Sequence, residues 1–238
     1  MEKITDKTGR IAFIGGGMMA EAILKGMLHK EIAEPEMIII SDPSAGRREY
    51  LEKTYKVNTT GCNAEAVKTA GFVILAVKPQ VADAAITKEV ADAIPQNTTV
   101  LSIMGSVNLD KLHKLVPGHA VIRVMPNTPL AVGCGMTAIA PDENVSEEML
   151  DVAKAVFGSC GEIEIIAESA IEAIAAVSGC GPGYVFMMID ALADAGVNAG
   201  LPRAMAIKLA AQTFAGSGKM VLDTGGFVNY GRFCVTGM

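Results

Sequence analysis

Residues 11–20, Ile11-Ala12-Phe13-Ile14-Gly15-Gly16-Gly17-Met18-Met19-Ala20, decide the fold of this chain. The four apolar residues predict a buried β-strand, the glycines a tight turn, and the residues from Met18 to about Leu28 an amphipathic helix. Gly15 would allow a sharp turn, Gly17 would let a pyrophosphate approach the backbone, and Ala20 would let the helix pack close to the sheet. A glycine turn alone is a weak signal, but one that joins a strand to a helix favours a phosphate site at the helix N-terminus. We therefore predict a dinucleotide-binding turn formed by Gly15, Gly16, Gly17, Met18, Met19 and Ala20.

Further apolar runs follow this turn and alternate with helical segments. They cover residues 37–40, 72–77, 100–104 and 120–124. Strands that are nearly continuous in apolar residues and are separated by helices are typical of a parallel sheet covered on both faces. The predicted fold class is therefore α/β, with a Rossmann-type, doubly wound and mostly parallel sheet.

The character of the sequence changes after residue 167, where strand patterns end and helical patterns dominate. Residues 184–197 are apolar on almost every side, and the next helix begins near Leu201-Pro202, with proline suited to a first helical turn. A helix that is apolar all round must be buried, and a small helical domain cannot bury that surface alone. We predict a dinucleotide-binding domain over residues 1–167 and a helical dimerisation and substrate domain over 168–238, and hence a dimer or higher homo-oligomer.

Composition excludes several classes of function. The chain has 238 residues and a formal net charge of −6, so bulk charge gives no argument for nucleic-acid binding. No run of about 20 uncharged apolar residues occurs, and we expect no membrane span. The five cysteines are scattered singly, without a Cys-x-x-Cys pair or a Cys/His cluster. This pattern predicts neither a metal site nor a disulfide framework, and it favours a cytoplasmic location.

The end of the second predicted strand, Ser41-Asp42, is where an adenosine ribose would lie. Asp42 follows the glycines at about the spacing expected of an acid that bonds the ribose hydroxyls and favours NAD. Ser44, Arg47 and Arg48 are close in sequence and would suit the 2′-phosphate of NADP, although the two arginines equally fit a solvated helix face. The sequence therefore leaves the choice between NAD and NADP open.

Three later segments narrow the family. They are Ala-Val-Lys-Pro-Gln at 76–80, Met-Pro-Asn-Thr-Pro at 125–129, and Ser-Gly-Cys-Gly-Pro-Gly-Tyr at 178–184. In this order, together with the glycine turn, they resemble the pyrroline-5-carboxylate reductases over about residues 10–225. The resemblance implies hydride transfer from NADPH or NADH to the C=N bond of 1-pyrroline-5-carboxylate, which gives L-proline in the last step of proline biosynthesis.

The resemblance also implies roles for individual residues. Val77, Lys78 and Pro79 match a loop that lies along the nicotinamide half of the cofactor. Asn63 matches a polar residue near the adenosine ribose, and Asn127 matches the asparagine of a turn close to the nicotinamide. A structural alternative exists for each position, because prolines stiffen loops and asparagine is a common turn residue.

The sequence also departs from the family. The Ser-Pro-Gly-Gly-Thr-Thr signature that holds the imino acid in the family is absent from these residues, and residues 227–238 are atypical. We expect a chain that ends early with a foreign or frame-shifted tail, and we assign no catalytic residue. His29, His113 and His119 lie in no matched motif and are expected at the surface, whereas Met104 is expected to narrow the nicotinamide pocket. Two alternatives remain: a dinucleotide-binding or assembly module without turnover, and a related reductase acting on a hydroxy acid or another imine.

Overall fold

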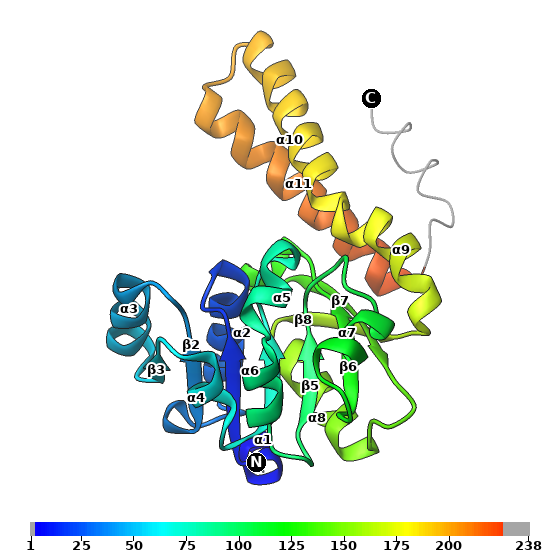
Figure 1. Ribbon diagram of the computed structural model, residues 1–238. Helices are drawn as coiled ribbons and strands as arrows, with labels where there is room; N and C mark the ends of the chain where they lie inside the picture. The colour runs from blue at the N-terminus through cyan, green and yellow to red at the C-terminus, as the bar shows by residue number, and fades with distance from the viewer. Residues whose placement is uncertain (1–2, 226–238) are drawn as a thin grey trace. The chain divides into compact units, whose positions relative to one another are not determined.

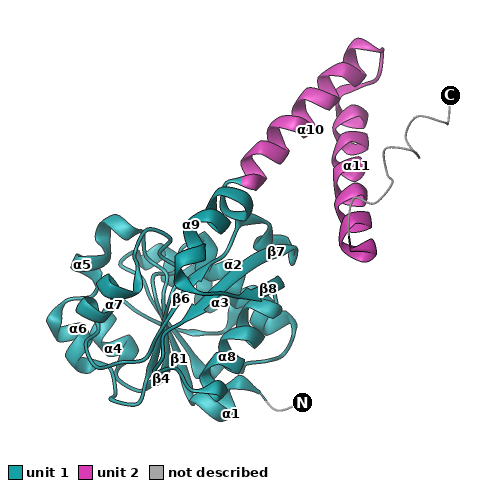
Figure 2. Cartoon of the chain, turned by 90° about the vertical axis from the view of Figure 1, so that its right-hand side faces the viewer, with its two compact units in different colours: residues 1–180 teal, residues 181–238 magenta. Residues whose placement is uncertain are grey.

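The computed structural model describes residues 3–225 (Figure 1), and the atypical residues 227–238 lie outside them. The chain divides into two compact units, residues 1–180 and residues 181–238 (Figure 2). The domain boundary predicted at 167/168 stays a prediction.

The first unit is built on an eight-stranded sheet with the order β3-β2-β1-β4-β5-β6-β7-β8. The neighbouring pairs from β3 to β6 are parallel, β7 is antiparallel to β6, and β8 is parallel to β7. The predicted α/β fold class with a mostly parallel sheet is confirmed. The strands are β1 (Arg10–Ile14), β2 (Ile38–Ser41), β3 (Asn58–Thr60), β4 (Ala70–Leu75), β5 (Thr99–Ser102), β6 (Val121–Met125), β7 (Gly135–Pro141) and β8 (Gly161–Ile165).

Helices cover both faces of this sheet, with α4 to α7 on one side and α2 and α8 on the other (Figure 2). The α-helices of the first unit are α1 (Ile4–Thr8), α2 (Met18–His29), α3 (Ala45–Tyr55), α4 (Asn63–Val67), α5 (Ala82–Ala85), α6 (Lys88–Ala93), α7 (Leu109–Leu115), α8 (Glu147–Gly158) and α9 (Ile171–Ile174). Short 3-10 turns lie at η1 (Pro35–Met37), η2 (Pro79–Val81), η3 (Thr128–Val132) and η4 (Glu168–Ala170), and a π-helical turn lies at η5 (Ala175–Gly179).

The central strand β1 shows how the sequence produces two cores. Ile11 and Phe13 belong to the core under α2 and α8, whereas Ala12 and Ile14 belong to the core under α4 to α7. All four side chains have no exposed surface. Because successive side chains of a strand point to opposite faces, a strand covered on both sides must be apolar at every position. This requirement explains the uninterrupted apolar run that precedes the glycines.

Strands β7 and β8 were not among the predicted strands. Strand β8 reads Gly-Glu-Ile-Glu-Ile and lies at one edge of the sheet. Its alternation of charged and apolar residues has the period of two that is typical of a strand with one face in solvent. Strand β8 contains no continuous apolar run of the kind that marks the predicted strands.

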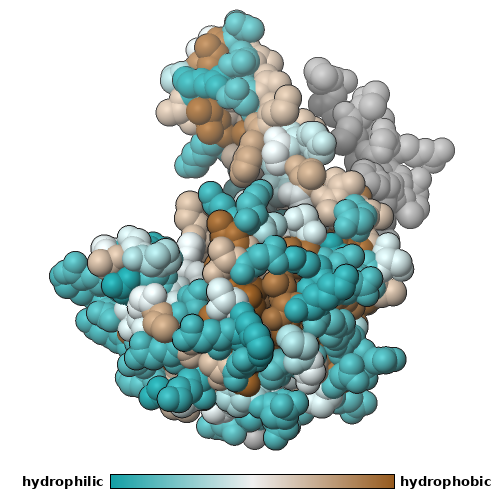
Figure 3. Space-filling view, viewed as in Figure 1, coloured by the Kyte–Doolittle hydropathy of each residue, from teal (hydrophilic) through white to brown (hydrophobic). Residues whose placement is uncertain are grey.

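The second unit consists of α10 (Gly181–Asn198) and α11 (Arg203–Thr224). Its buried core is small and consists of Ala193, Ala206 and Ala210. Gly196 allows the two helices to approach closely, because a Cβ at this position would lie 3.1 Å from the Cβ of Ala206. Figure 3 shows apolar residues on the outer surface of these helices, where Phe186 is 63% exposed. Two helices alone therefore leave most of their apolar side chains uncovered.

One helical stretch in the described residues, 168–198, is long and apolar enough to cross a membrane by length and composition. It carries Glu168, Glu172, Asp190 and Asp194. A helix that is covered by another subunit has the same composition, because an obligate interface resembles a domain core. The exposed apolar surface of the second unit agrees with the predicted oligomeric helical domain.

Candidate dinucleotide-binding site

The glycine turn joins β1 to α2, and each glycine meets a different constraint. Gly15 has a φ of +100°, and a Cβ there would lie 2.7 Å from the carbonyl oxygen of Ala76. A Cβ at Gly16 would lie 2.9 Å from Leu51. At Gly17, by contrast, a Cβ would meet nothing within 4 Å. The first two glycines are therefore needed by the fold, whereas Gly17 leaves open space beside the backbone.

That open space lies at the start of α2. The helix begins at Met18 with Gly17 at the N-cap position, and no side chain caps its N-terminus. The N–H groups of a first helical turn have no acceptor inside the helix, and together with the helix dipole they attract phosphate. Met18 is 89% exposed, whereas Ala20 is buried. The residues present thus fit a pyrophosphate, which needs free N–H donors and no obstructing side chain.

Ser41, Asp42 and Asn63 lie together next to this turn. The Asp42 carboxylate accepts hydrogen bonds from the backbone N–H of Gly16 (3.0 Å) and of Ser44 (2.9 Å). The buried Ser41 hydroxyl donates to Oδ1 of Asn63, whose Nδ2 donates to the carbonyl of Ala85 at 2.8 Å. Side chains from β2 and α4 are thereby fixed beside the glycine turn, where the ribose of a dinucleotide lies in folds of this kind.

A cluster of polar residues that the sequence analysis did not predict holds α3 against α2. Glu21 accepts hydrogen bonds from Arg47 (2.5 Å), Tyr50 (2.8 Å) and Tyr55 (2.7 Å). Partial burial alone would raise the pKa of Glu21. The bonds from Tyr55, Arg47 and Tyr50 outweigh burial and hold the pKa of this carboxyl below its usual range. Burial and the Glu21 carboxylate raise the pKa of Tyr55.

The residues predicted near the nicotinamide follow β4 and β6. Val77 packs against the glycine turn, since its Cγ1 would lie 3.0 Å from a Cβ at Gly15. Lys78 is exposed and precedes η2, in which Pro79 takes the first position. The backbone N–H of Ala76 donates to Ile14 at 2.8 Å, which extends the ladder between β4 and β1. This loop thus leaves the carboxyl end of β4 directly beside the glycine turn.

Asn127 lies after β6, and its amide nitrogen and oxygen each bond to a backbone group. Its Nδ2 donates to the carbonyl of Ser178 at 3.0 Å, and its Oδ1 accepts from the N–H of Met136 at 2.9 Å. Met104, in contrast, is only 1% exposed and belongs to the core under α4 to α7. Met104 is thus a core residue, and the expectation that it narrows the nicotinamide pocket stays a prediction.

The structure also contains a buried cation that the sequence analysis missed. Arg123 on β6 donates to the carbonyl of Gly105 (2.6 Å), to Glu168 (3.1 Å) and to Glu172 (3.2 Å). Its Nε is buried and has no hydrogen-bond partner. The backbone N–H of Leu109 also donates to Glu168, at 2.7 Å. These contacts join the ends of β5 and β6 to the segment that leads into α9.

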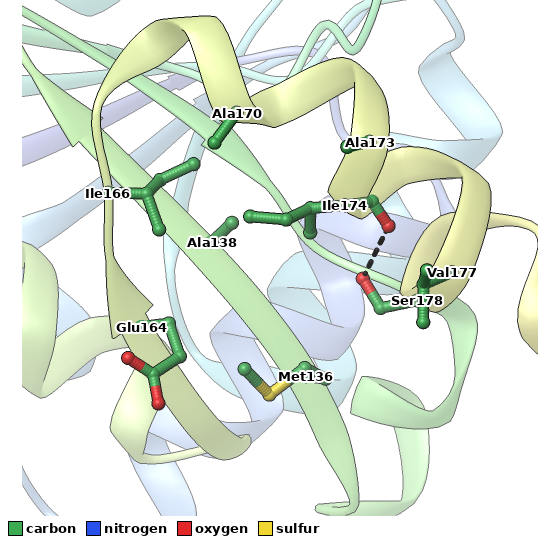
Figure 4. A pocket seen from close by; sticks show the side chains of 9 residues that line it. All are labelled: Met136, Ala138, Glu164, Ile166, Ala170, Ala173, Ile174, Val177 and Ser178. Carbon is green, nitrogen blue, oxygen red and sulfur yellow. Dashed lines mark hydrogen bonds between the residues drawn. The ribbon is translucent and has the colours of Figure 1, made fainter.

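A hollow in the first unit adjoins Asn127, which is bonded to two of its lining residues, Met136 and Ser178. It is an open hollow of about 430 Å³ between β7, β8 and the α9–η5 segment (Figure 4). Its lining is almost wholly apolar, with Glu164 as its one ionisable side chain and Ser178 bonded to the carbonyl of Ile174 at 3.2 Å. No group of three or more potential metal ligands occurs among residues 3–225.

The comparisons with known proteins assign the chain to a family. Residues 168–229 match the model described as pyrroline-5-carboxylate reductase dimerisation. A pyrroline-5-carboxylate reductase of Synechocystis is 45% identical over 215 residues, which are 90% of this chain and 80% of the relative. This chain belongs to the pyrroline-5-carboxylate reductase family. The corresponding enzyme of Escherichia coli is 40% identical over 219 residues, or 91% of this chain and 80% of the relative.

Solved structures agree with this assignment. The pyrroline-5-carboxylate reductase of Coxiella burnetii superposes with a TM-score of 0.88 at 31% identity, over 96% of this chain and 85% of that one. A Plasmodium falciparum pyrroline carboxylate reductase with NADP bound gives 0.80 at 32% identity, over 89% of this chain and 78% of that one. Residues 10–106 match the model described as NADP oxidoreductase, coenzyme F420-dependent. The predicted family, the reductase function and the class of NAD(P)H-dependent oxidoreductase are confirmed.

Proposed function

We propose that this pyrroline-5-carboxylate reductase binds its dinucleotide across the carboxyl ends of β1, β2, β4 and β6, and there reduces 1-pyrroline-5-carboxylate to L-proline. The observation that carries the proposal is the open, uncapped start of α2 beside Gly17. The pyrophosphate would lie there, with Ser41, Asp42 and Asn63 at the adenosine half and Val77, Lys78, Pro79 and Asn127 at the nicotinamide half.

The protein contributes mainly binding and orientation to this reaction. The reduced nicotinamide supplies the hydride, and a protonated imine is the better acceptor for it. The loops after β4 and β6 would hold the substrate so that its C=N carbon faces the nicotinamide ring. Binding of two reactants in the correct orientation lowers the activation free energy of hydride transfer. The partners in the proposal are 1-pyrroline-5-carboxylate and further copies of the chain, in the cytoplasm, with no metal, nucleic acid or membrane.

Steady-state assays in both directions test the proposal. With the full chain, oxidation of NADH or NADPH that depends on 1-pyrroline-5-carboxylate is followed by absorbance, and proline-dependent reduction of NAD and NADP is followed at high pH. We expect rates well above those of a heat-inactivated control. A folded chain that binds a dinucleotide and turns over neither substrate would instead support a binding or assembly module, whereas a folded chain that binds neither dinucleotide would refute the site itself.

A further inference from the structure

We propose that this site prefers NADH to NADPH, and that Asp42 determines the preference. The inference rests on the proposed function, since it concerns the adenosine half of the same dinucleotide site. Two dinucleotides that differ only by a 2′-phosphate on this ribose are distinguished by the groups that face it. The preference for NADH or NADPH therefore depends on the charges and the free hydrogen-bonding groups at the end of β2 and the start of α2.

The Asp42 carboxylate is held in place from two sides. One oxygen accepts from the N–H of Gly16 at 3.0 Å, and the other accepts from the N–H of Ser44 at 2.9 Å. The backbone N–H of Asp42 itself donates to the carbonyl of Thr60 at 3.1 Å. A negative charge is thus fixed against the glycine turn. An ionised carboxylate has lone pairs left to accept from the two ribose hydroxyls, and it would repel a phosphate placed at the same position.

Arg47, one of the two cations that would attract a 2′-phosphate, is paired with an acid. Arg47 donates through Nε to the carbonyl of Gly16 and through Nη2 to the carboxylate of Glu21, both at 2.5 Å. Its guanidinium also lies 5.2 Å from the centre of the Tyr50 ring. To face a phosphate, Arg47 would have to leave a carboxylate that is only 20% exposed.

Arg48 is bonded to the loop that follows β2. Its Nη1 donates to the carbonyls of Asp42 (2.7 Å) and Pro43 (3.1 Å), and it lies 3.4 Å from where a Cβ of Gly61 would be. Of the hydroxyls next to Asp42, Ser41 donates to Asn63 and Thr60 donates to Glu65 at 2.5 Å, whereas Ser44 accepts from the N–H of Arg47 at 3.3 Å. Close to the ribose position, Asp42 thus supplies a fixed anion, Arg47 is paired with an acid, and Arg48 is bonded to two backbone carbonyls.

Fluorescence titration of the full chain with NADH and with NADPH tests the inference. We expect NADH to bind about tenfold or more tightly, which is the effect of one or two hydrogen bonds to a charged group. Asp42→Ser should weaken NADH binding and strengthen NADPH binding, so that the ratio of the two dissociation constants falls by about tenfold or more. Glu49→Gln removes the same charge from an exposed position on α3 and should leave the ratio unchanged.

A second variant separates the role of Arg48 from that of Asp42. If Arg48 serves only the backbone of the loop, Arg48→Gln changes the affinity for both dinucleotides by the same factor. A selective loss of NADPH affinity in Arg48→Gln, or equal or tighter binding of NADPH by the unaltered chain, would overturn the preference while the reductase site stands. Absence of binding of either dinucleotide to folded protein would refute the proposed function instead.

Discussion

The side chain of Asn127 bridges two elements of the first unit: it donates to the carbonyl of Ser178 at 3.0 Å, and it accepts from the N–H of Met136 at 2.9 Å. Ser178 lies in the π-helical turn η5, and Met136 lies on β7. Turns of this type inside helices often occur at functional sites. Asn127 therefore fixes the loop after β6 to η5 and to β7. This structural role is independent of any contact that Asn127 makes with a nicotinamide ring.

This bridge gives the first prediction. Asn127→Ala leaves the Ser178 carbonyl and the Met136 N–H without a partner, and we expect a loss of about 1–3 kcal/mol in the free energy of unfolding, measured by urea denaturation. Asn127→Asp keeps the acceptor and loses the donor, so it should also be destabilised. If Asn127→Ala proves as stable as the parent and loses only dinucleotide affinity, the bridge is not a structural element and the residue serves the cofactor alone.

The second prediction concerns Gly17. Because a Cβ at this position meets nothing within 4 Å, Gly17→Val should fold normally. Its side chain would fill the space that the pyrophosphate needs, and we expect a loss of dinucleotide affinity of about tenfold or more.

The control for this change is Gly158→Val at the end of α8, where a Cβ also meets nothing within 4 Å. It should leave the affinity unchanged, and it should not weaken the helix, because valine is a better helix former than glycine. Equal affinities of Gly17→Val and the parent protein would place the pyrophosphate elsewhere.

The glycine turn and the parallel sheet could be predicted from the residue types at individual positions. Gly15 is required by its positive φ and by the carbonyl 2.7 Å away, and an apolar strand such as β1 is required wherever helices cover both faces of a sheet. Each constraint dictates the residue types at its own positions, a glycine in the turn and an apolar run in the strand, and for that reason both can be recognised in the sequence.

Contacts between residues that are distant in the sequence could not be predicted from it. Asn127 and Ser178 are 51 residues apart, and Arg123 finds Glu168 at a separation of 45. His119, which we expected at the surface, is only 7% exposed and lies 3.3 Å from the carbonyl of Thr98. No local pattern marks such partners, because tertiary packing brings them together.

The third prediction is a dependence of stability on pH. Hydrogen bonds from Tyr55, Arg47 and Tyr50 hold the pKa of Glu21 below its usual value of 4.5. A carboxyl whose pKa is lower in the folded state than in the unfolded state stabilises the fold above its unfolded pKa. That stability is lost as the pH falls through the folded pKa.

Urea midpoints measured from pH 7 down to about pH 3 test this dependence. As the pH falls below the pKa that Glu21 has in the unfolded state, the parent protein should lose more stability than Glu21→Gln does. The plots of stability against pH for the two proteins should converge at the acid end. Glu49→Gln serves as the control, since the pair of Glu49 with Lys53 is more than 60% exposed on both sides. Parallel curves for the parent and Glu21→Gln would show that Glu21 titrates alike in both states.

The fourth prediction compares two carboxylates that pair with the same buried arginine. The distances from Arg123 to Glu168 and Glu172 are nearly equal, at 3.1 and 3.2 Å, but the side chain of Glu168 is 30% exposed and that of Glu172 is 82% exposed. Glu168 also accepts from the N–H of Leu109. Exposed ion pairs contribute about 0–1 kcal/mol, because water screens them and both side chains lose freedom. Removal of a partner from a buried charge costs several kcal/mol.

We therefore expect Glu168→Ala to lower the free energy of unfolding by about 2–4 kcal/mol and Glu172→Ala by less than about 0.5 kcal/mol. Arg123→Met removes the charge together with its unpaired Nε, and it should cost less than Glu168→Ala, which leaves the cation buried without its main partner. Urea unfolding of the three variants at equal protein concentration measures these differences, since assembly also contributes to stability. Equal losses of stability in Glu168→Ala and Glu172→Ala would show that burial does not decide the contribution of each carboxylate. The exposed Glu172 would then stabilise the Arg123 cation as much as the less exposed Glu168 does.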